Sequence, residues 1–295
     1  MAVTVRKFTE RQIIMSTKSG QCSQISSLGG SIEHLSVFVA SDGQILSYKR
    51  AGNGRNKVIF LHDWSVSVDG DYAFAAPFFN GDSLEVVFAD LRGYGGSYDL
   101  RGDYTAEEIC DDVCALADEL GWDKFNIVGH SMTGLVVQKI MADLPDRVIK
   151  AVAAVPVPAT GTQPDDATLQ FLETVPFKDD AFRTAMTTLT SEMYGEAWLN
   201  FKLIQNRRSV RPDAMKSYVK MFARSNYSRE VSGCVTPFLV IFGSYDSLTL
   251  REETTGAIFA RMFPNLTTKK LTAGHYPMVE APVAYAKTVE EFLLS

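Results

Sequence analysis

Short apolar runs that alternate with helical patterns constrain the fold of this 295-residue chain more than any other feature. Turn residues such as Gly and Asp punctuate the runs, and their length and continuity are typical of strands buried on both faces of a sheet. The predicted strands cover residues 58–61, 84–89, 125–128, 148–155, 238–242 and 266–271. Strands that alternate with helices need right-handed crossover connections, so the chain is predicted to form a mostly parallel α/β sheet.

Two local signals support this division into elements. An antiparallel pair is expected at the start of the sheet, where residues 37–39 and 45–48 flank a turn at Asp42-Gly43. The clearest helix begins after Thr105, whose side chain can cap it while Glu108 reaches back. Its apolar stripe consists of Ile109, Val113, Leu116 and Leu120.

The pattern changes twice along the chain and so divides it into a leader, a core and an insertion. Residues 1–34 are rich in Ser, Gln and Gly and are expected to form a loosely ordered leader. The α/β core is expected to comprise residues 35–155 and 236–295. Residues 156–235 lack the alternation and carry aromatic and Met side chains on helical segments, which predicts an inserted helical cap. Most of these side chains are expected to pack the cap itself, and a minority to face a substrate.

A serine stands where a predicted strand meets a predicted helix. The strand at 125–128 is followed by the sequence GHSMTG over residues 129–134 and then by a helical pattern. Such a turn holds Ser131 at the carboxyl end of a parallel sheet, between small residues that let the backbones approach closely. The helix N-terminus beyond it favours negative charge that develops nearby. Ser131 is therefore the candidate nucleophile.

An acid and a histidine follow downstream in the order that a serine nucleophile needs. Asp246 lies just beyond the strand at 238–242 and is the candidate acid, and His275 follows the strand at 266–271 and is the candidate base. His130 is the alternative base because it adjoins Ser131. Neighbouring side chains at such a turn diverge, so His130 is expected to be structural or to line the pocket.

Five motifs in the right order make the chain resemble the α/β-hydrolase family from about residue 35 to its end. Residues 61–64 (LHDW) are similar to the HGxx oxyanion loop, and residues 90–97 (DLRGYGGS) to a DxRGxGxS turn. Residues 129–134 resemble GHSMGG, 243–246 (GSYD) resemble GxxD, and 274–282 (GHYPMVEAP) resemble GHxPxxExP. The resemblance implies a mostly parallel eight-stranded sheet, flanked by helices, with an inserted cap.

The resemblance also implies a binding site around the triad. The backbone N–H groups of Trp64 and Met132 are expected to form the oxyanion hole. The side chains expected to line the pocket are those of His62, His130, Trp198 and Tyr276. The DLRGYGGS turn is expected to be structural.

Two residues depart from the family pattern. Thr133 replaces a glycine of the serine motif, which is tolerable because the position requires only a small side chain. Asp63 replaces the glycine that follows the oxyanion-loop histidine. A carboxylate facing the oxyanion would oppose its charge, so the Asp63 side chain is expected to point away from it.

These residues imply a serine hydrolase that cleaves a small or medium carboxylic ester or lactone through an acyl-enzyme, without a metal or organic cofactor. A thioesterase or carbon–carbon bond hydrolase would share the triad and stays open. A cofactor-independent dioxygenase of this fold is a further alternative, although Pro156-Val157-Pro158-Ala159 lacks the carboxylate it would place before the cap. A ligand receptor built on a hydrolase scaffold is the remaining one.

Charge and composition limit the classes of partner and the location that are expected for this protein. The net charge is −6 and basic residues are scattered, so nucleic acid is not expected, and a small-molecule substrate is. No apolar stretch approaches the roughly 20 residues that span a bilayer, and no secretory signal is recognised, so no membrane partner and a cytoplasmic location are expected. The four cysteines are expected to be reduced, with Cys110 and Cys114 packed rather than metal-binding. The oligomeric state is not indicated.

Overall fold

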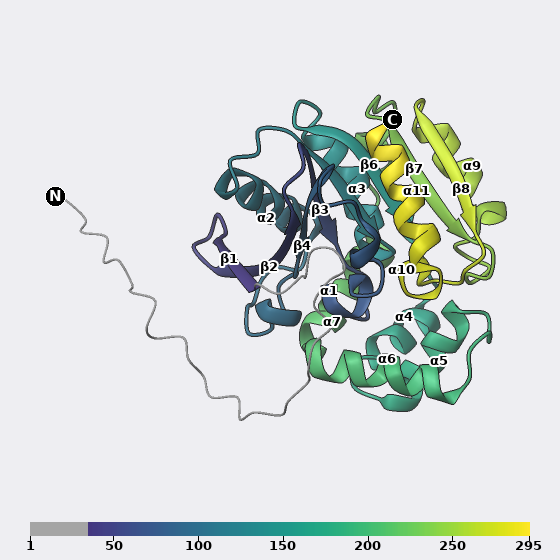
Figure 1. Ribbon diagram of the computed structural model, residues 1–295. Coiled ribbons are helices and arrows are strands. Elements are labelled where there is room, and N and C mark those ends of the chain that lie inside the picture. Colours follow the sequence, from purple (N-terminus) through teal and green to yellow (C-terminus); the bar gives the residue numbers. More distant parts are fainter. Residues whose placement is uncertain (1–34) are drawn as a thin grey trace, which may run out of the picture.

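An eight-stranded sheet forms the centre of the computed structural model, which describes residues 35–295 (Figure 1). The expected leader, residues 1–34, lies outside the described residues. The strands are β1 (Leu35–Val39), β2 (Ile45–Gly52), β3 (Asn56–Leu61), β4 (Leu84–Ala89), β5 (Phe125–His130), β6 (Val148–Ala154), β7 (Phe238–Gly243) and β8 (Leu266–Leu271). Their order across the sheet is β1-β2-β4-β3-β5-β6-β7-β8.

The sheet is parallel apart from its first strands. β1 pairs antiparallel with β2, and β2 pairs antiparallel with β4. Every pair from β4–β3 through β7–β8 is parallel. The turn between β1 and β2 uses Gly43 at φ +83°, a conformation that glycine adopts without steric cost. The predicted parallel sheet and its antiparallel opening pair are both confirmed.

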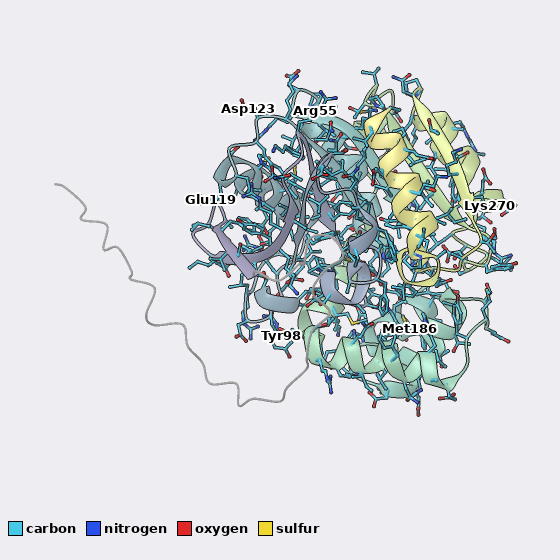
Figure 2. All side chains as sticks on the ribbon, in the orientation of Figure 1. Arg55, Tyr98, Glu119, Asp123, Met186 and Lys270 are labelled. Carbon is cyan, nitrogen blue, oxygen red and sulfur yellow. The ribbon has the colours of Figure 1, made fainter. Side chains whose placement is uncertain are left out.

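Burial of the strands follows their place in the sheet. All six residues of each of the strands β4, β5 and β7 are buried, as predicted for strands covered on both faces. The prediction of the same burial for β8 is wrong, because its four central residues are exposed. β8 is the last strand of the sheet, and it carries Lys269 and Lys270. Charged side chains such as that of Lys270 (Figure 2) keep an edge strand from pairing with other chains.

Helices connect the strands and flank the sheet. They are α1 (Val68–Tyr72), α2 (Ala106–Glu119), α3 (Met132–Asp143), α4 (Asp166–Thr174), α5 (Asp179–Leu189), α6 (Glu196–Ser209), α7 (Pro212–Arg224), α8 (Ser228–Val231), α9 (Glu252–Met262), α10 (Pro277–Glu280) and α11 (Pro282–Leu294). Short 3₁₀ turns span Ala76–Phe78 and Gly95–Ser97. Among the helices of residues 35–295, none is long and apolar enough to cross a bilayer.

The start of α2 differs in one detail from its prediction. The Thr105 side chain caps the helix by accepting a hydrogen bond from the backbone N–H of Glu108, at 3.1 Å. The Glu108 carboxylate accepts from the backbone N–H groups of Asp103 and Tyr104, both at 2.9 Å, and not from that of Thr105. The cap therefore extends over the turn before the helix, because Glu108 reaches further back than a standard capping box requires.

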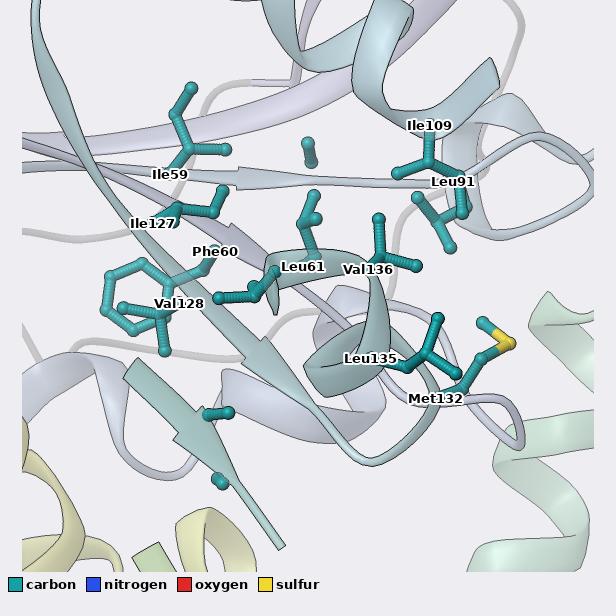
Figure 3. Close-up of a cluster of buried hydrophobic side chains, with 14 of the residues drawn as sticks. Ile59, Phe60, Leu61, Leu91, Ile109, Ile127, Val128, Met132, Leu135 and Val136 are labelled. Atoms are coloured by element: carbon teal, nitrogen blue, oxygen red, sulfur yellow. The ribbon is translucent and has the colours of Figure 1, made fainter. Parts of the chain in front are cut away.

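Helix α3 packs on the central strands β5 and β6. Ile59 and Phe60 of β3, Val128 of β5, and Leu135 and Val136 of α3 belong to one cluster of hydrophobic side chains, and all five are fully buried (Figure 3). Burying each such side chain contributes about 1.5–3 kcal/mol relative to leaving it in water. This packing fixes the junction of β5 and α3, where Ser131 lies.

The turn at residues 90–97 holds three parts of the fold together. Asp90 accepts hydrogen bonds from the Ser47 hydroxyl and from the backbone N–H groups of Val68 and Gly96. The Arg92 guanidinium binds both oxygens of Asp112 on α2, at 2.9 and 2.7 Å. These buried contacts fit the structural role that was predicted for this turn.

Helices α4 to α8 lie between β6 and β7, and we call them the cap. Figure 1 shows α4 to α7 grouped at one end of the molecule, next to α1 and α10. The α6 helix begins at Glu196 and ends at Ser209, and its neighbours α5 and α7 pack with buried Phe, Met and Tyr side chains. The cap therefore covers the end of the sheet at which β5, β7 and β8 end.

Candidate active site

Ser131 occupies a strained turn between β5 and α3. Its φ is +52° and its ψ is −109°, a conformation that non-glycine residues rarely adopt. The turn is held by hydrogen bonds from the Ser131 N–H to the Ala154 carbonyl, at 2.9 Å, and from the Gly134 N–H to the Ser131 carbonyl, at 3.0 Å. Gly129 leaves the required space, because a Cβ there would approach the Thr133 carbonyl to 2.5 Å. The strain turns the Ser131 side chain away from the core, and 7% of the residue is exposed.

Three side chains predicted to act together form one hydrogen-bonded chain. The Ser131 Oγ lies 2.8 Å from His275 Nε2, and His275 Nδ1 lies 2.9 Å from Asp246 Oδ1. Asp246 follows β7 and His275 follows β8, so neighbouring parallel strands deliver both side chains to one edge of the sheet. A carboxylate can only accept, so Nδ1 carries the proton and Nε2 is left to accept from the serine hydroxyl.

Hydrogen bonds to its carboxylate and to its backbone carbonyl hold Asp246, the candidate acid, in position. The backbone N–H of Ser247 donates to Asp246 Oδ1 at 2.6 Å. The Asp246 carbonyl accepts from Arg251 Nε at 2.7 Å and from the hydroxyl of Ser191, which precedes the cap helix α6, at 2.9 Å. Asp246 and His275 are at most 1% exposed. Their mutual hydrogen bond is therefore shielded from water, which strengthens it.

The N–H groups of Trp64 and Met132 are available for an oxyanion. Met132 is the first residue of α3, so its N–H has no partner within the helix. Within residues 35–295, neither N–H donates to a protein acceptor. The Trp64 carbonyl accepts from the Tyr94 hydroxyl at 2.7 Å, which fixes the orientation of this peptide segment. The oxyanion hole stays a prediction that these free donors support.

His62 does not fit its predicted place in the pocket lining. It is fully buried, its Nδ1 donates to the Asp63 carbonyl at 2.7 Å, and its Nε2 accepts from the Leu91 N–H at 3.0 Å. Both ring nitrogens are thus used to join the oxyanion loop to the loop after β4. We correct the expectation accordingly, since His62 holds a loop in place rather than facing a ligand.

His130 is held as an imidazolium. Its Nδ1 lies 2.8 Å from Asp71 Oδ2, and its Nε2 lies 2.7 Å from the backbone carbonyl of His275. Both partners only accept hydrogen bonds, so both ring nitrogens carry protons. Burial favours the neutral ring, but the neighbouring Asp71 outweighs it and raises the pKa of His130. His130 is therefore a positioning residue for the main chain of the candidate base, as its structural interpretation anticipated.

Asp63 belongs to the same buried polar cluster. Its backbone N–H donates to Asp71 Oδ2 at 2.7 Å, and its Oδ2 accepts from the Ser65 hydroxyl at 2.7 Å. Burial opposes its charge, yet attraction to His130 outweighs this and lowers the pKa of Asp63. The Asp63 carboxylate is thus ionised. The hydrogen bond from the Ser65 hydroxyl and the positive charge of His130 partly offset its negative charge.

Asp63, Asp71 and His130 present ligand atoms within 4.8 Å of one another, a spacing that a metal ion could use. The donor set argues for a different role. Both nitrogens of His130 already serve oxygen acceptors, so neither has a lone pair free for a metal. The cluster is therefore accounted for by its hydrogen bonds and charges.

Tyr276 and Trp198 lie where the cap meets the core. The buried Tyr276 ring lies 5.3 Å from the His275 ring, and its hydroxyl is 2.9 Å from that of Ser65 and 3.1 Å from Met186 Sδ. Met186 belongs to the cap (Figure 2). Trp198, on α6, is half-buried with its ring 5.6 Å from that of Tyr276. Tyr276 is thus next to His275, and Trp198 is next to Tyr276, while their place beside a substrate stays a prediction.

Sequence reasoning missed two contributors to this site, Asp71 and Lys202. Asp71 lies in the short helix α1 and faces His130, which is 59 positions away along the chain. Lys202 lies on α6 and is completely buried. Lysines and aspartates are rarely buried, so neither residue type is expected inside a site without a motif around it.

Comparisons with known proteins agree with this fold. Residues 56–282 match the family model described as the alpha/beta hydrolase fold. The chain belongs to this family. Among solved structures, an esterase from Exiguobacterium antarcticum has a TM-score of 0.78 at 14% identity, over 88% of this chain and 99% of that one.

Curated relatives match over different shares of their lengths. A non-heme haloperoxidase from Rhodococcus erythropolis is 28% identical over 231 residues, which cover 71% of this chain and 81% of the relative. The dihydrolipoyllysine-residue acetyltransferase component of the acetoin cleaving system of Cupriavidus necator is 32% identical over 120 residues. That match covers 41% of this chain, and the chain spans only 32% of the length of that relative.

Proposed function

We propose that this member of the family is a serine hydrolase that cleaves a small or medium carboxylic ester or lactone. The observation that carries the proposal is the hydrogen-bonded chain from Ser131 through His275 to Asp246. His275 already accepts a hydrogen bond from the Ser131 hydroxyl in the tautomer that catalysis needs, so the triad needs no rearrangement before attack.

In the first half of the proposed reaction, the Ser131 Oγ attacks the carbonyl carbon of the substrate. His275 Nε2 takes the serine proton, and Asp246 stabilises the imidazolium that forms. The carbonyl oxygen becomes an oxyanion, which accepts from the N–H groups of Trp64 and Met132. His275 then gives its proton to the departing alkoxide oxygen as the carbon–oxygen bond breaks, and an acyl-enzyme remains.

Water completes the proposed cycle. His275 Nε2 removes a proton from a water molecule, whose oxygen attacks the acyl carbon. The tetrahedral intermediate collapses, the bond to Ser131 breaks, and His275 returns the proton to the Ser131 Oγ. The aromatic rings of Trp198 and Tyr276 favour apolar parts of the substrate, which supports an ester or lactone of small or medium size.

A panel of p-nitrophenyl esters of increasing chain length, assayed beside simple lactones, tests the proposal. The wild type is expected to turn over at least one class, and Ser131→Ala to lower kcat by about 10⁴-fold or more. The circular dichroism spectrum should be unchanged, because the substitution removes one hydroxyl and no core contact. Turnover retained by Ser131→Ala would contradict the assignment of the nucleophile.

A further inference from the structure

Lys202 is a buried cation without a hydrogen-bond partner at the junction of cap and core. The residue is completely buried, and its Nζ makes no hydrogen bond to any group in residues 35–295. The ammonium lies 3.7 Å from the centre of the Tyr276 ring, a cation–π contact that replaces only part of its lost hydration. A buried ammonium with three unused donors is costly, so it indicates an anion or oxygen acceptor that the protein itself does not provide.

The surroundings of Lys202 place it beside the triad. Tyr276 directly follows His275 in the chain, and their rings are 5.3 Å apart. Asn206, one turn further along α6, donates to the Ser65 carbonyl at 2.7 Å. Lys202 and Asn206 are four positions apart on α6 and so share one face of the helix, which meets the loop that carries Trp64 through Asn206 and the Tyr276 ring through Lys202.

The carboxylates near Lys202 make their hydrogen bonds to other donors, and one of their oxygens, Asp71 Oδ1, is buried without a hydrogen-bond partner. Asp71 Oδ2 accepts from His130 and from the Asp63 N–H, and Asp63 Oδ2 accepts from Ser65. Glu280 accepts from the Tyr276 N–H at 2.9 Å and from the Tyr194 hydroxyl at 2.8 Å. None of them forms an ion pair with Lys202 within 4.0 Å in the described part of the chain, although their charges act on it from further away. Burial nevertheless prevails over their attraction and lowers the pKa of Lys202.

We propose that Lys202 binds a carboxylate on the acyl part of the substrate, so that the protein prefers esters or lactones that carry a second, anionic group. This inference rests on the proposed hydrolase function and specifies its substrate class. A charge-assisted hydrogen bond in a site shielded from water is strong and directional, and it would supply the acceptor that the ammonium lacks. The cation would then orient the acyl chain relative to Ser131.

Two esters of equal chain length test the inference. The mono-p-nitrophenyl ester of glutaric acid carries a free carboxylate, and p-nitrophenyl pentanoate does not. The wild type is expected to cleave the anionic ester with a kcat/KM about tenfold or more above that of the neutral ester. Lys202→Met should remove this preference, mainly through a higher KM for the anionic ester. Lys220→Met, an exposed lysine of the cap helix α7, is the control and should keep the preference.

The outcomes separate this inference from the function on which it rests. Equal kcat/KM values for both esters in the wild type would overturn the role of Lys202 and leave the hydrolase intact. An equal loss on both esters in Lys202→Met, with a large fall in thermal midpoint, would make Lys202 a structural counter-ion of Asp63. Failure to cleave either ester, together with no turnover of any ester or lactone in the panel above, would overturn both proposals. The wild-type comparison needs no variant, so the test stands even where Lys202→Met does not fold.

Discussion

The geometry of single residues determines what Ser131 can do. The Ser131 backbone has a positive φ, and its hydroxyl lies within hydrogen-bonding distance of His275 Nε2. The hydrogen bond of 2.9 Å between His275 Nδ1 and Asp246 leaves Nε2 free of a proton. The order of donors and acceptors is therefore set before a substrate arrives. A change in any one of the three side chains disturbs the tautomer or the nucleophile rather than the fold.

The acid is tested by Asp246→Asn. The amide would offer an N–H to His275 Nδ1 and so favour the tautomer that carries its proton on Nε2, which cannot accept from serine. We expect kcat for the best ester to fall by about 10³- to 10⁴-fold, with KM little changed. Asp180→Asn, at an exposed position of α5, is the matched control. A nearly silent Asp246→Asn would mean that another group orients His275.

Asp63 is tested by Asp63→Asn, which keeps an oxygen for the Ser65 hydroxyl but removes the charge. The His130 imidazolium and Lys202 would lose a nearby counter-charge, so we expect the free energy of unfolding to fall by about 1–3 kcal/mol in urea titrations. We expect kcat to stay within about tenfold. A rise in kcat of about a hundredfold, close to 3 kcal/mol, would show that the wild-type site suppresses oxyanion chemistry and would favour the dioxygenase or receptor alternative.

At the scale of elements, the site depends on links between segments that are distant in sequence. His130 at the end of β5 binds α1 through Asp71 and binds the loop after β8 through the His275 carbonyl. The cap helix α6 binds the oxyanion loop through Asn206 and Ser65. Each link fixes one loop of the site relative to a rigid strand or helix, which keeps the reacting groups in place.

The His130 link makes stability depend on pH. The pKa of His130 is raised above its ordinary value of 6.5 in the folded protein, so its contribution is fully present below pH 6.5 and is lost as the pH rises through the folded pKa. In that window the free energy of unfolding should fall by up to about 1.4 kcal/mol per pH unit. Urea titrations from pH 6 to 9 on the wild type and His130→Gln should show this slope in the wild type alone. Parallel pH profiles for the two proteins would contradict the imidazolium assignment.

For the whole molecule, local patterns predicted the sheet and the triad because each depends on a short stretch of sequence. The apolar runs marked the strands, and Ser131, Asp246 and His275 each followed one of them. The exposure of β8 also had a local signal, since Lys269 and Lys270 mark an edge strand.

The cluster around Asp63 had no such signal. Its contacts join residues that are far apart in sequence, such as Ser65 and Tyr276, which are 211 positions apart. The burial of Lys202 depends on how α6 docks against the core, which the mixed polar and apolar sequence of that helix does not specify. Tertiary packing therefore decides which charged residues enter the site.

The central claim is that Ser131 is an activated nucleophile, and fluorophosphonate labelling tests it most directly. A fluorophosphonate phosphonylates a serine, with loss of fluoride, only where a base and an oxyanion site activate it. Intact-protein mass spectrometry should show one adduct on the wild type, peptide mapping should place it on Ser131, and Ser131→Ala should remain unlabelled. An unlabelled wild type, or an adduct that persists in Ser131→Ala, would contradict the account.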